Sequence, residues 1–304
     1  MTASLRVIPL ALAKRLRRQQ LFPYLLFPLC TLVGCTAIKP PPGAGQMLTA
    51  PGTFSHDDLD RVLHRFVDEQ GQVDYAALKN NAADLDRYYF LITAYSPDSH
   101  PDLFPTPQSK LAYWLNAYNA AVIKTVLTYY PISSVGDIRP PLALFFFPDK
   151  SGFFLFQRVT FGTKSTSLYV VEHQVIRARF ADPRVHFALN CASLGCPRLP
   201  QDAFSAEQLD TQLNRETRRF LSEERNLAID HQEKTVWLSS IFDWYEGDFL
   251  QWYQSQFPGK KAKLLDYVAL YVPQEKAEEL QRTATYQIRF IPYDWRLNEQ
   301  RRRA

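Results

Sequence analysis

Apolar residues recur at helical spacing through most of this 304-residue chain. Behind Ser55, a common type of N-cap residue, Leu59, Val62, Leu63 and Phe66 fall on one face of a helix predicted over residues 55–69. The same spacing predicts further helices over residues 83–94, 108–130, 167–180, 205–221, 247–256, 262–271 and 274–284. Pro131 would end the longest of them.

Short runs rich in aromatic and β-branched residues predict strands. These runs cover residues 142–147, 153–161, 184–190, 227–229, 234–238 and 286–291. The segments 227–229 and 234–238 would form a hairpin. Mixed helices and strands without a regular alternation predict an α+β fold, with several helices packed on a mainly antiparallel sheet.

The N-terminal segment has the pattern of an export signal. Residues 1–20 hold five basic side chains and no acidic one, and a short apolar run over residues 21–34 precedes Cys35. This run is too short and too interrupted by proline to span a hydrocarbon core, which needs about 20 apolar residues. We therefore expect residues 1–34 to be a signal peptide.

The junction at Cys35 predicts a lipid anchor. Leu32-Val33-Gly34-Cys35 resembles the lipobox of bacterial lipoproteins, which implies cleavage before Cys35 and acylation of its sulfur with chains such as palmitate. A Pro/Gly-rich tether over residues 35–53 would follow. The expected location is the cell envelope, facing the periplasm. The outer membrane is favoured because Thr36 stands where an inner-membrane retention signal often has Asp.

Processing changes the charge of the protein. The formal net charge is +4, and five positive side chains would leave with the signal, so the mature balance is 4 − 5 = −1. No basic face remains to suggest nucleic acid as a partner. We expect one domain over residues 54–298, followed by a basic tail over residues 299–304.

The groups best suited to chemistry are concentrated in residues 167–197. They are Glu172, His173, His186, Asn190, Cys191 and Cys196. Glu172 shares the apolar face of its predicted helix, where burial would raise the pKa of the carboxyl group unless Arg179 or a histidine pairs with it. Glu172 could therefore serve either in a structural ion pair or as a catalytic carboxylate.

The predicted strand 184–190 places its side chains on two faces. His186 and Asn190 fall on one face, and Cys191 falls with the apolar residues on the other, where unreactive cysteines usually lie. Cys191 and Cys196 are the cysteines that remain beyond Cys35. In an oxidising compartment two nearby cysteines often form a disulfide, although geometry decides this.

Two asparagines on the predicted helix 108–130 are expected to have fixed hydrogen-bond partners. Asn116 and Asn119 lie one turn apart on an otherwise apolar helix, and asparagine is a mediocre helix former. Their amides would either hold neighbouring loop backbone in place or contact a ligand directly.

Six motifs in a fixed order resemble a known family. They are the segments 71–75, 114–119, 167–173, 186–197, 241–249 and 293–298. Together, across about residues 54–298, they are similar to the family of domains of unknown function numbered 547 (DUF547). The resemblance implies a single domain, often exported in bacteria, without an established activity. A fainter similarity to papain and transglutaminase architecture would place Asn116 or Asn119 where those enzymes have a cysteine.

Three functions fit this pattern. The first is a binding or structural domain of the envelope that takes a peptide, glycan or protein partner. The second is a thiol hydrolase or acyltransferase, with Cys191 as nucleophile, His173 or His186 as base, and Glu172 or an asparagine as orienting group. The third is zinc held by both cysteines and histidine, although the cysteine spacing matches structural zinc motifs poorly. We favour the first and expect no cofactor and no metal.

Overall fold

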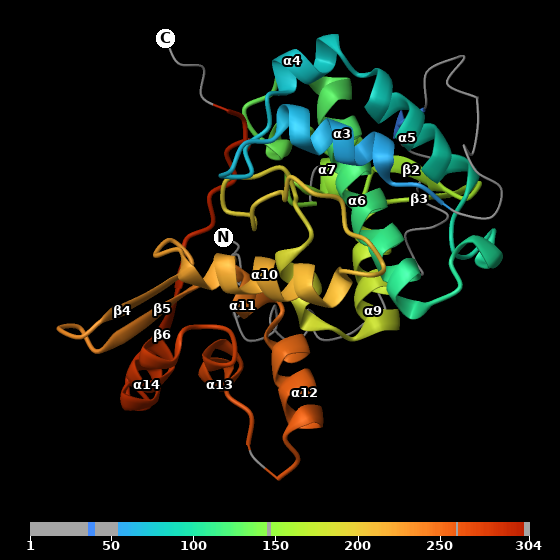
Figure 1. The fold of residues 1–304 in the computed structure, drawn as a ribbon. Helices are drawn as coiled ribbons and strands as arrows, with labels where there is room; N and C mark the ends of the chain where they lie inside the picture. The colour runs from blue at the N-terminus through green and yellow to red at the C-terminus, as the bar shows by residue number, and fades with distance from the viewer. Residues whose placement is uncertain (1–35, 40–53, 145–146, 260, 301–304) are drawn as a thin grey trace, which may run out of the picture.

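The computed structural model describes residues 36–39, 54–144, 147–259 and 261–300 (Figure 1). The predicted signal peptide, Cys35, most of the predicted tether and the last four residues lie outside these ranges. Within them, no helix combines the length and the hydropathy needed to cross a membrane.

Two of the first three helices follow the prediction. Helix α3 (Asp57–Phe66) is shorter than expected because Val67 leaves it to form a β-bridge with Val73. Helix α5 (Ala83–Ala94) has the predicted bounds. The short helix α4 (Tyr75–Asn80) was not predicted; Asp74 caps it by accepting a hydrogen bond from the Ala77 amide.

Helix α6 (Pro107–Tyr129) forms the centre of the first hydrophobic core. Thr106 caps it, since its side chain accepts a hydrogen bond from the Ser109 amide and Pro107 suits the first helical turn. Most of the helix is buried, including Asn116 and Asn119. The predicted helix is thus confirmed, and it ends two residues before Pro131.

The helix predicted over residues 167–180 is also confirmed, with an irregular centre. It consists of α8 (Leu168–Val170), the π-helical segment η4 (Val171–Ile176) and α9 (Arg177–Phe180), and Ser167 caps its start. Such π segments occur frequently at functional sites. Here the segment carries both Glu172 and His173.

The strand predicted over residues 184–190 is wrong. Residues 183–187 form the 3-10 helix η5 (Pro183–Phe187), and the Asp182 side chain caps it by accepting a hydrogen bond from the Arg184 amide. Proline at its first position favours a helical start and cannot donate to a sheet. The expected alternation of His186 and Asn190 against Cys191 therefore does not exist.

Two other aromatic runs were read too readily as strands. Residues 142–144 form the 3-10 turn η3 (Leu142–Leu144), and residues 145–146 lie outside the described ranges. In the second run, α7 (Ser151–Phe154) comes first and only β2 (Gln157–Phe161) is extended. The short turns η1 (Pro101–Leu103) and η2 (Val135–Asp137) complete this half of the chain.

The described strands form two small mixed sheets of three strands each. In the first, β2 pairs in parallel with β1 (Thr36–Ala37) and antiparallel with β3 (Lys164–Thr166). In the second, β4 (Leu227–Asp230) and β5 (Thr235–Ser239) form the predicted hairpin, and β6 (Gln287–Ile291) adds in parallel to β5. The α+β class is confirmed.

Five helices accompany the second sheet. They are α10 (Leu209–Ser222), α11 (Ser240–Trp244), α12 (Glu246–Gln256), α13 (Leu264–Ala269) and α14 (Gln274–Arg282). All except α11 were predicted, with bounds that differ by a few residues. Helices α12 and α13 pack with the sheet into a second hydrophobic core.

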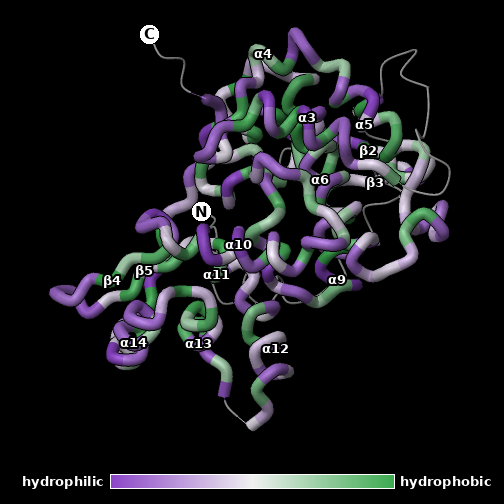
Figure 2. The backbone as a smooth tube through the Cα atoms, in the orientation of Figure 1, coloured by the Kyte–Doolittle hydropathy of each residue, from purple (hydrophilic) through white to green (hydrophobic). Residues whose placement is uncertain are grey.

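Two elements belong to both cores. Figure 1 shows α10 crossing between the first group of helices and the group formed by α12–α14 with the second sheet. Its Leu209 and Leu213 pack in the first core, whereas Phe220 packs in the second. The backbone of α10 is otherwise mostly hydrophilic (Figure 2). In η5, Val185 belongs to the first core and Phe187 to the second. The region between the two cores is where most of the predicted site residues gather.

Candidate functional site

Glu172 lies between the two cores and binds a tyrosine from each side. Its carboxylate accepts hydrogen bonds from Tyr118 Oη of α6, at 3.2 Å, and from Tyr245 Oη beyond α11, at 2.5 Å. Burial alone would raise the pKa of Glu172, but the charge of His173 and the hydrogen bond from Tyr245 outweigh it and lower that pKa. Arg179, one of the partners considered for Glu172, pairs with Asp98 instead.

His186 is part of a second ionic group beside Glu172. Its Nε2 donates to Asp248 Oδ2 at 2.8 Å, and Arg177 donates to both oxygens of Asp248 at 2.7 and 2.9 Å. Burial would raise the pKa of Asp248, but the hydrogen bonds from His186 and Arg177 hold it well below the ordinary value. The Tyr245 ring stacks on His186, with ring centres 3.9 Å apart, which joins this group to Glu172.

His173 is held against its own helix. Its Nδ1 donates to the Tyr169 carbonyl oxygen at 3.1 Å, and its ring stacks on Tyr169 at 4.0 Å. Burial lowers the pKa of His173, although the nearby Glu172 opposes this. Because Nδ1 carries the proton of this hydrogen bond, Nε2 acts as an acceptor whenever the ring is neutral.

Cys191 and Cys196 form a disulfide. Tyr293 lies over the bond, with its Oη 3.0 Å from each sulfur. Neither residue presents a free thiol in this state, so the nucleophile that a thiol hydrolase needs is absent from it.

The three candidate asparagines bind backbone. Asn116 bonds the carbonyl and the amide of Phe204, at 2.8 and 2.9 Å. Asn119 accepts from the Asn190 amide and donates to the Ala188 carbonyl, both at 2.9 Å. Asn190 in turn donates to the Pro197 carbonyl at 2.8 Å. These carboxamides tie the segment 188–204 to α6, which is one of the two roles considered for Asn116 and Asn119.

A cavity of about 430 Å³ lies beside the disulfide, with Cys196 in its wall. Its walls come mainly from four segments, 70–72, 190–198, 219–226 and 291–298. Of the candidate residues, Asn190 and Cys196 line it, whereas Glu172, His173 and His186 do not. The site residues predicted from sequence are thus divided between a filled polar network and an open cavity.

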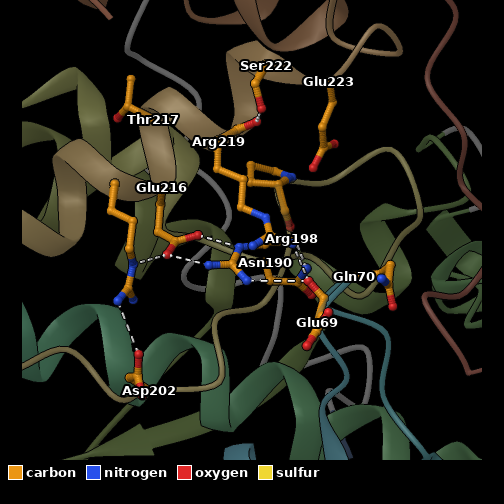
Figure 3. A network of polar contacts seen from close by, with 12 residues as sticks. Glu69, Gln70, Asn190, Arg198, Asp202, Glu216, Thr217, Arg219, Ser222 and Glu223 are labelled. Atoms are coloured by element: carbon orange, nitrogen blue, oxygen red, sulfur yellow. Dashed lines mark hydrogen bonds and ion pairs between the residues drawn. The ribbon is translucent and has the colours of Figure 1, made fainter.

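The cavity has polar groups that sequence analysis did not single out. Figure 3 shows Arg198 bonded to Glu216, and Arg219 reaching from α10 toward Glu69. Ser193 also lines the cavity; it is 1% exposed, and its Oγ is buried without a hydrogen-bond partner. Arginines on a hydrophilic helix look like ordinary surface residues, so the sequence held no signal for Arg219.

One group of possible metal ligands occurs in the described residues. Asp60, His64 and Asp202 place their ligand atoms within 4.8 Å of one another at the surface. Each nitrogen of His64 already faces one of the two carboxylates, and Arg215 also pairs with Asp202. This arrangement is an ordinary ion-pair cluster.

Comparison with known proteins gives one match, to a family model. No curated protein and no solved structure matches the chain. A family model described as "Protein of unknown function, DUF547" matches residues 104–221. Three of the six motifs lie within this segment, including those with the Glu172–His173 pair and both cysteines. The match covers less than half of the chain, and over residues 104–221 the chain is similar to the DUF547 family of proteins of unknown function.

Proposed function

We propose that the protein is a lipid-anchored, ligand-binding protein of the bacterial cell envelope, and that its ligand occupies the cavity beside the Cys191–Cys196 disulfide. The observation that carries the proposal is this cavity, whose lining includes the charged side chains of Arg219 and Glu223.

The cavity has the size and the rigid walls of a binding site. Its volume falls in the range of about 300–1,000 Å³ that is usual for small-molecule pockets. Two walls are joined by hydrogen bonds of 2.8 Å, from the Gly195 amide to the Asp294 carbonyl and from the Leu194 amide to the Arg296 carbonyl. A side chain at Gly195 would collide with the backbone of Asp294, its Cβ lying 2.8 Å from the amide nitrogen. Such a preformed site loses little entropy when it binds.

Binding is favoured over thiol chemistry. A hydrolase would need Cys191 as a thiolate, and its sulfur is bonded to Cys196. The proposed base His186 is engaged with Asp248, and Glu172 with two tyrosines. The hydrolase would therefore require reduction of the disulfide and release of at least one of these groups.

The anchor rests on the sequence at Cys35, and the fold suggests how it would orient the domain. Thr36 pairs with Gln157 in the first sheet, and Ile38 is buried. Consecutive Cα atoms are about 3.8 Å apart, so an acylated Cys35 would hold the edge of this sheet close to the membrane. Several acyl chains on one residue are sufficient for stable attachment.

Intact-mass spectrometry of the protein extracted from its host membranes without reductant tests the anchor and the choice between binding and thiol chemistry. We expect a chain that starts at Cys35 and carries the added mass of acyl chains. Treatment with an alkylating agent should add no mass, because both remaining cysteines are in the disulfide.

Cys35→Ser should abolish the lipid mass and release the protein from the membrane fraction, whereas Cys30→Ser is the matched control and should change neither. An unlipidated native protein would contradict the anchor. An alkylated Cys191 would favour the hydrolase.

A further inference from the structure

We infer that the ligand of this cavity carries both a carboxylate and an amino group, as amino acids and short peptides do, and that Arg219 and Glu223 recognise the two ends. This inference rests on the proposed binding function and specifies its ligand class. It follows from the charges that line the cavity and from which of them already have partners.

Arg219 is the cavity arginine without a carboxylate partner in the described part of the chain. Arg198 makes a two-pronged ion pair with Glu216, and Arg225 pairs with Glu223. Arg219 instead donates one hydrogen bond, from Nη2 to the Glu69 carbonyl at 2.6 Å. Its remaining N–H groups can bind a carboxylate in the planar, two-pronged geometry that guanidinium favours.

Glu223 supplies the opposite charge on the same wall. It is the residue directly after α10 and lies about one turn beyond Arg219. Figure 3 shows the two side chains on the same side of this end of the helix, above Glu69 and Gln70. Its Oε2 accepts from Arg225 and Asn226, at 2.7 and 3.0 Å, whereas its Oε1 has no hydrogen bond among the described residues. This oxygen can accept from an ammonium group or a peptide N–H.

Two observations narrow the ligand further. The cavity presents charges of both signs, because Arg219 and Arg225 line it together with the carboxylates of Glu223 and Asp294, while Glu216 neutralises Arg198. Such a lining suits a zwitterion better than a doubly charged phosphate. Leu194, Ile291 and Pro292 line the cavity as well, which provides an apolar surface for a small side chain.

Calorimetric titration with three related probes tests the inference: alanyl-alanine, its C-terminal amide and its N-acetyl form. Each modification removes one charge and leaves the rest of the molecule unchanged. Because hydrogen bonds to charged groups are strong, we expect the free dipeptide to bind about ten- to a hundredfold more tightly than either derivative.

Variants assign each end of the ligand. Arg219→Gln should weaken binding of the dipeptide to the level of its amide, whereas the exposed neighbour Arg218→Gln should not. Glu223→Gln should remove the preference for the free amine over the N-acetyl form, with exposed Glu224→Gln as control. The thermal midpoint of each variant shows whether a loss of binding reflects a loss of folding.

The outcomes separate this inference from the proposed function. Equal affinity for all three probes, or tighter binding of inorganic phosphate, would contradict the inference and leave a binding cavity. The inference alone would also fail if the dipeptides do not bind while other members of a chemically diverse set shift the NMR signals of cavity residues. No response at the cavity to any of these molecules would overturn both.

Discussion

At the scale of single residues, Glu172 connects the two halves of the molecule. Tyr118 belongs to the first core, and Tyr245 packs against the second. Both phenol groups donate to the Glu172 carboxylate. A carboxylate can accept from two donors at once, whereas an amide would place its own N–H groups against one of them. The ionised form of Glu172 is therefore part of how the cores are joined.

Replacing Glu172 by glutamine should destabilise the protein by about 2 kcal/mol, because one buried phenol would lose its acceptor and an amide N–H would face it. Urea unfolding at neutral pH measures this free energy. Glu275→Gln is a matched control on the exposed surface of α14 and should have little effect. Equal unfolding free energies for the two variants would show that Glu172 has no role in joining the cores.

At the scale of elements, the segment after η5 depends on three kinds of restraint. Asn119 holds its backbone to α6, the disulfide closes the loop between Cys191 and Cys196, and the Leu194 amide pairs with the chain at Arg296. Tyr293 covers the disulfide from the same C-terminal segment. These restraints position the cavity wall, although the segment itself is neither long helix nor strand.

Removing the disulfide should therefore lower stability without unfolding the domain. For a closed loop of this length, chain entropy predicts a loss of about 2 kcal/mol in the double variant Cys191→Ser with Cys196→Ser. Urea unfolding of the variant and of the reduced wild-type protein measures it, and both should give the same free energy. A change near zero would show that the other restraints are sufficient.

At the scale of the whole molecule, buried histidines of both regions make stability depend on pH in one direction. Burial lowers the pKa of His56 to about 4, and it also lowers the pKa values of His173 and His186. In the unfolded chain these groups titrate near pH 6.5. Below that pH the unfolded state binds protons that the folded state does not, so acid favours unfolding.

We expect the free energy of unfolding to fall as the pH is lowered from about 6.5 toward 4, by up to about 1.4 kcal/mol per pH unit for each such histidine. Between about pH 7 and 8 these groups contribute no slope. His56→Gln should reduce the slope of the unfolding free energy against pH by up to the contribution of one bound proton. Urea unfolding across this pH range measures the slope. An unchanged slope would show that His56 is protonated in the folded protein.

Local signals in the sequence predicted most helices correctly. The bounds of α5 and the start of the helix at Ser167 followed from apolar spacing and capping residues, which act over a few neighbouring positions. The same reasoning failed for η5, because an apolar run next to Pro183 reads equally as a buried strand or as a turn of helix. Aromatic runs such as 142–144 and 153–154 failed for the same reason.

The sequence by itself determined the α+β class, the family resemblance and the segment that holds Glu172, His173 and the two cysteines, and it predicts an anchor at Cys35. Only the tertiary structure decided what these groups contact. Glu172 meets Tyr118 and Tyr245 across more than 50 positions of sequence in either direction, and Arg219 meets the cavity only because α10 crosses both cores. Such contacts depend on how distant segments pack, and no local pattern encodes them.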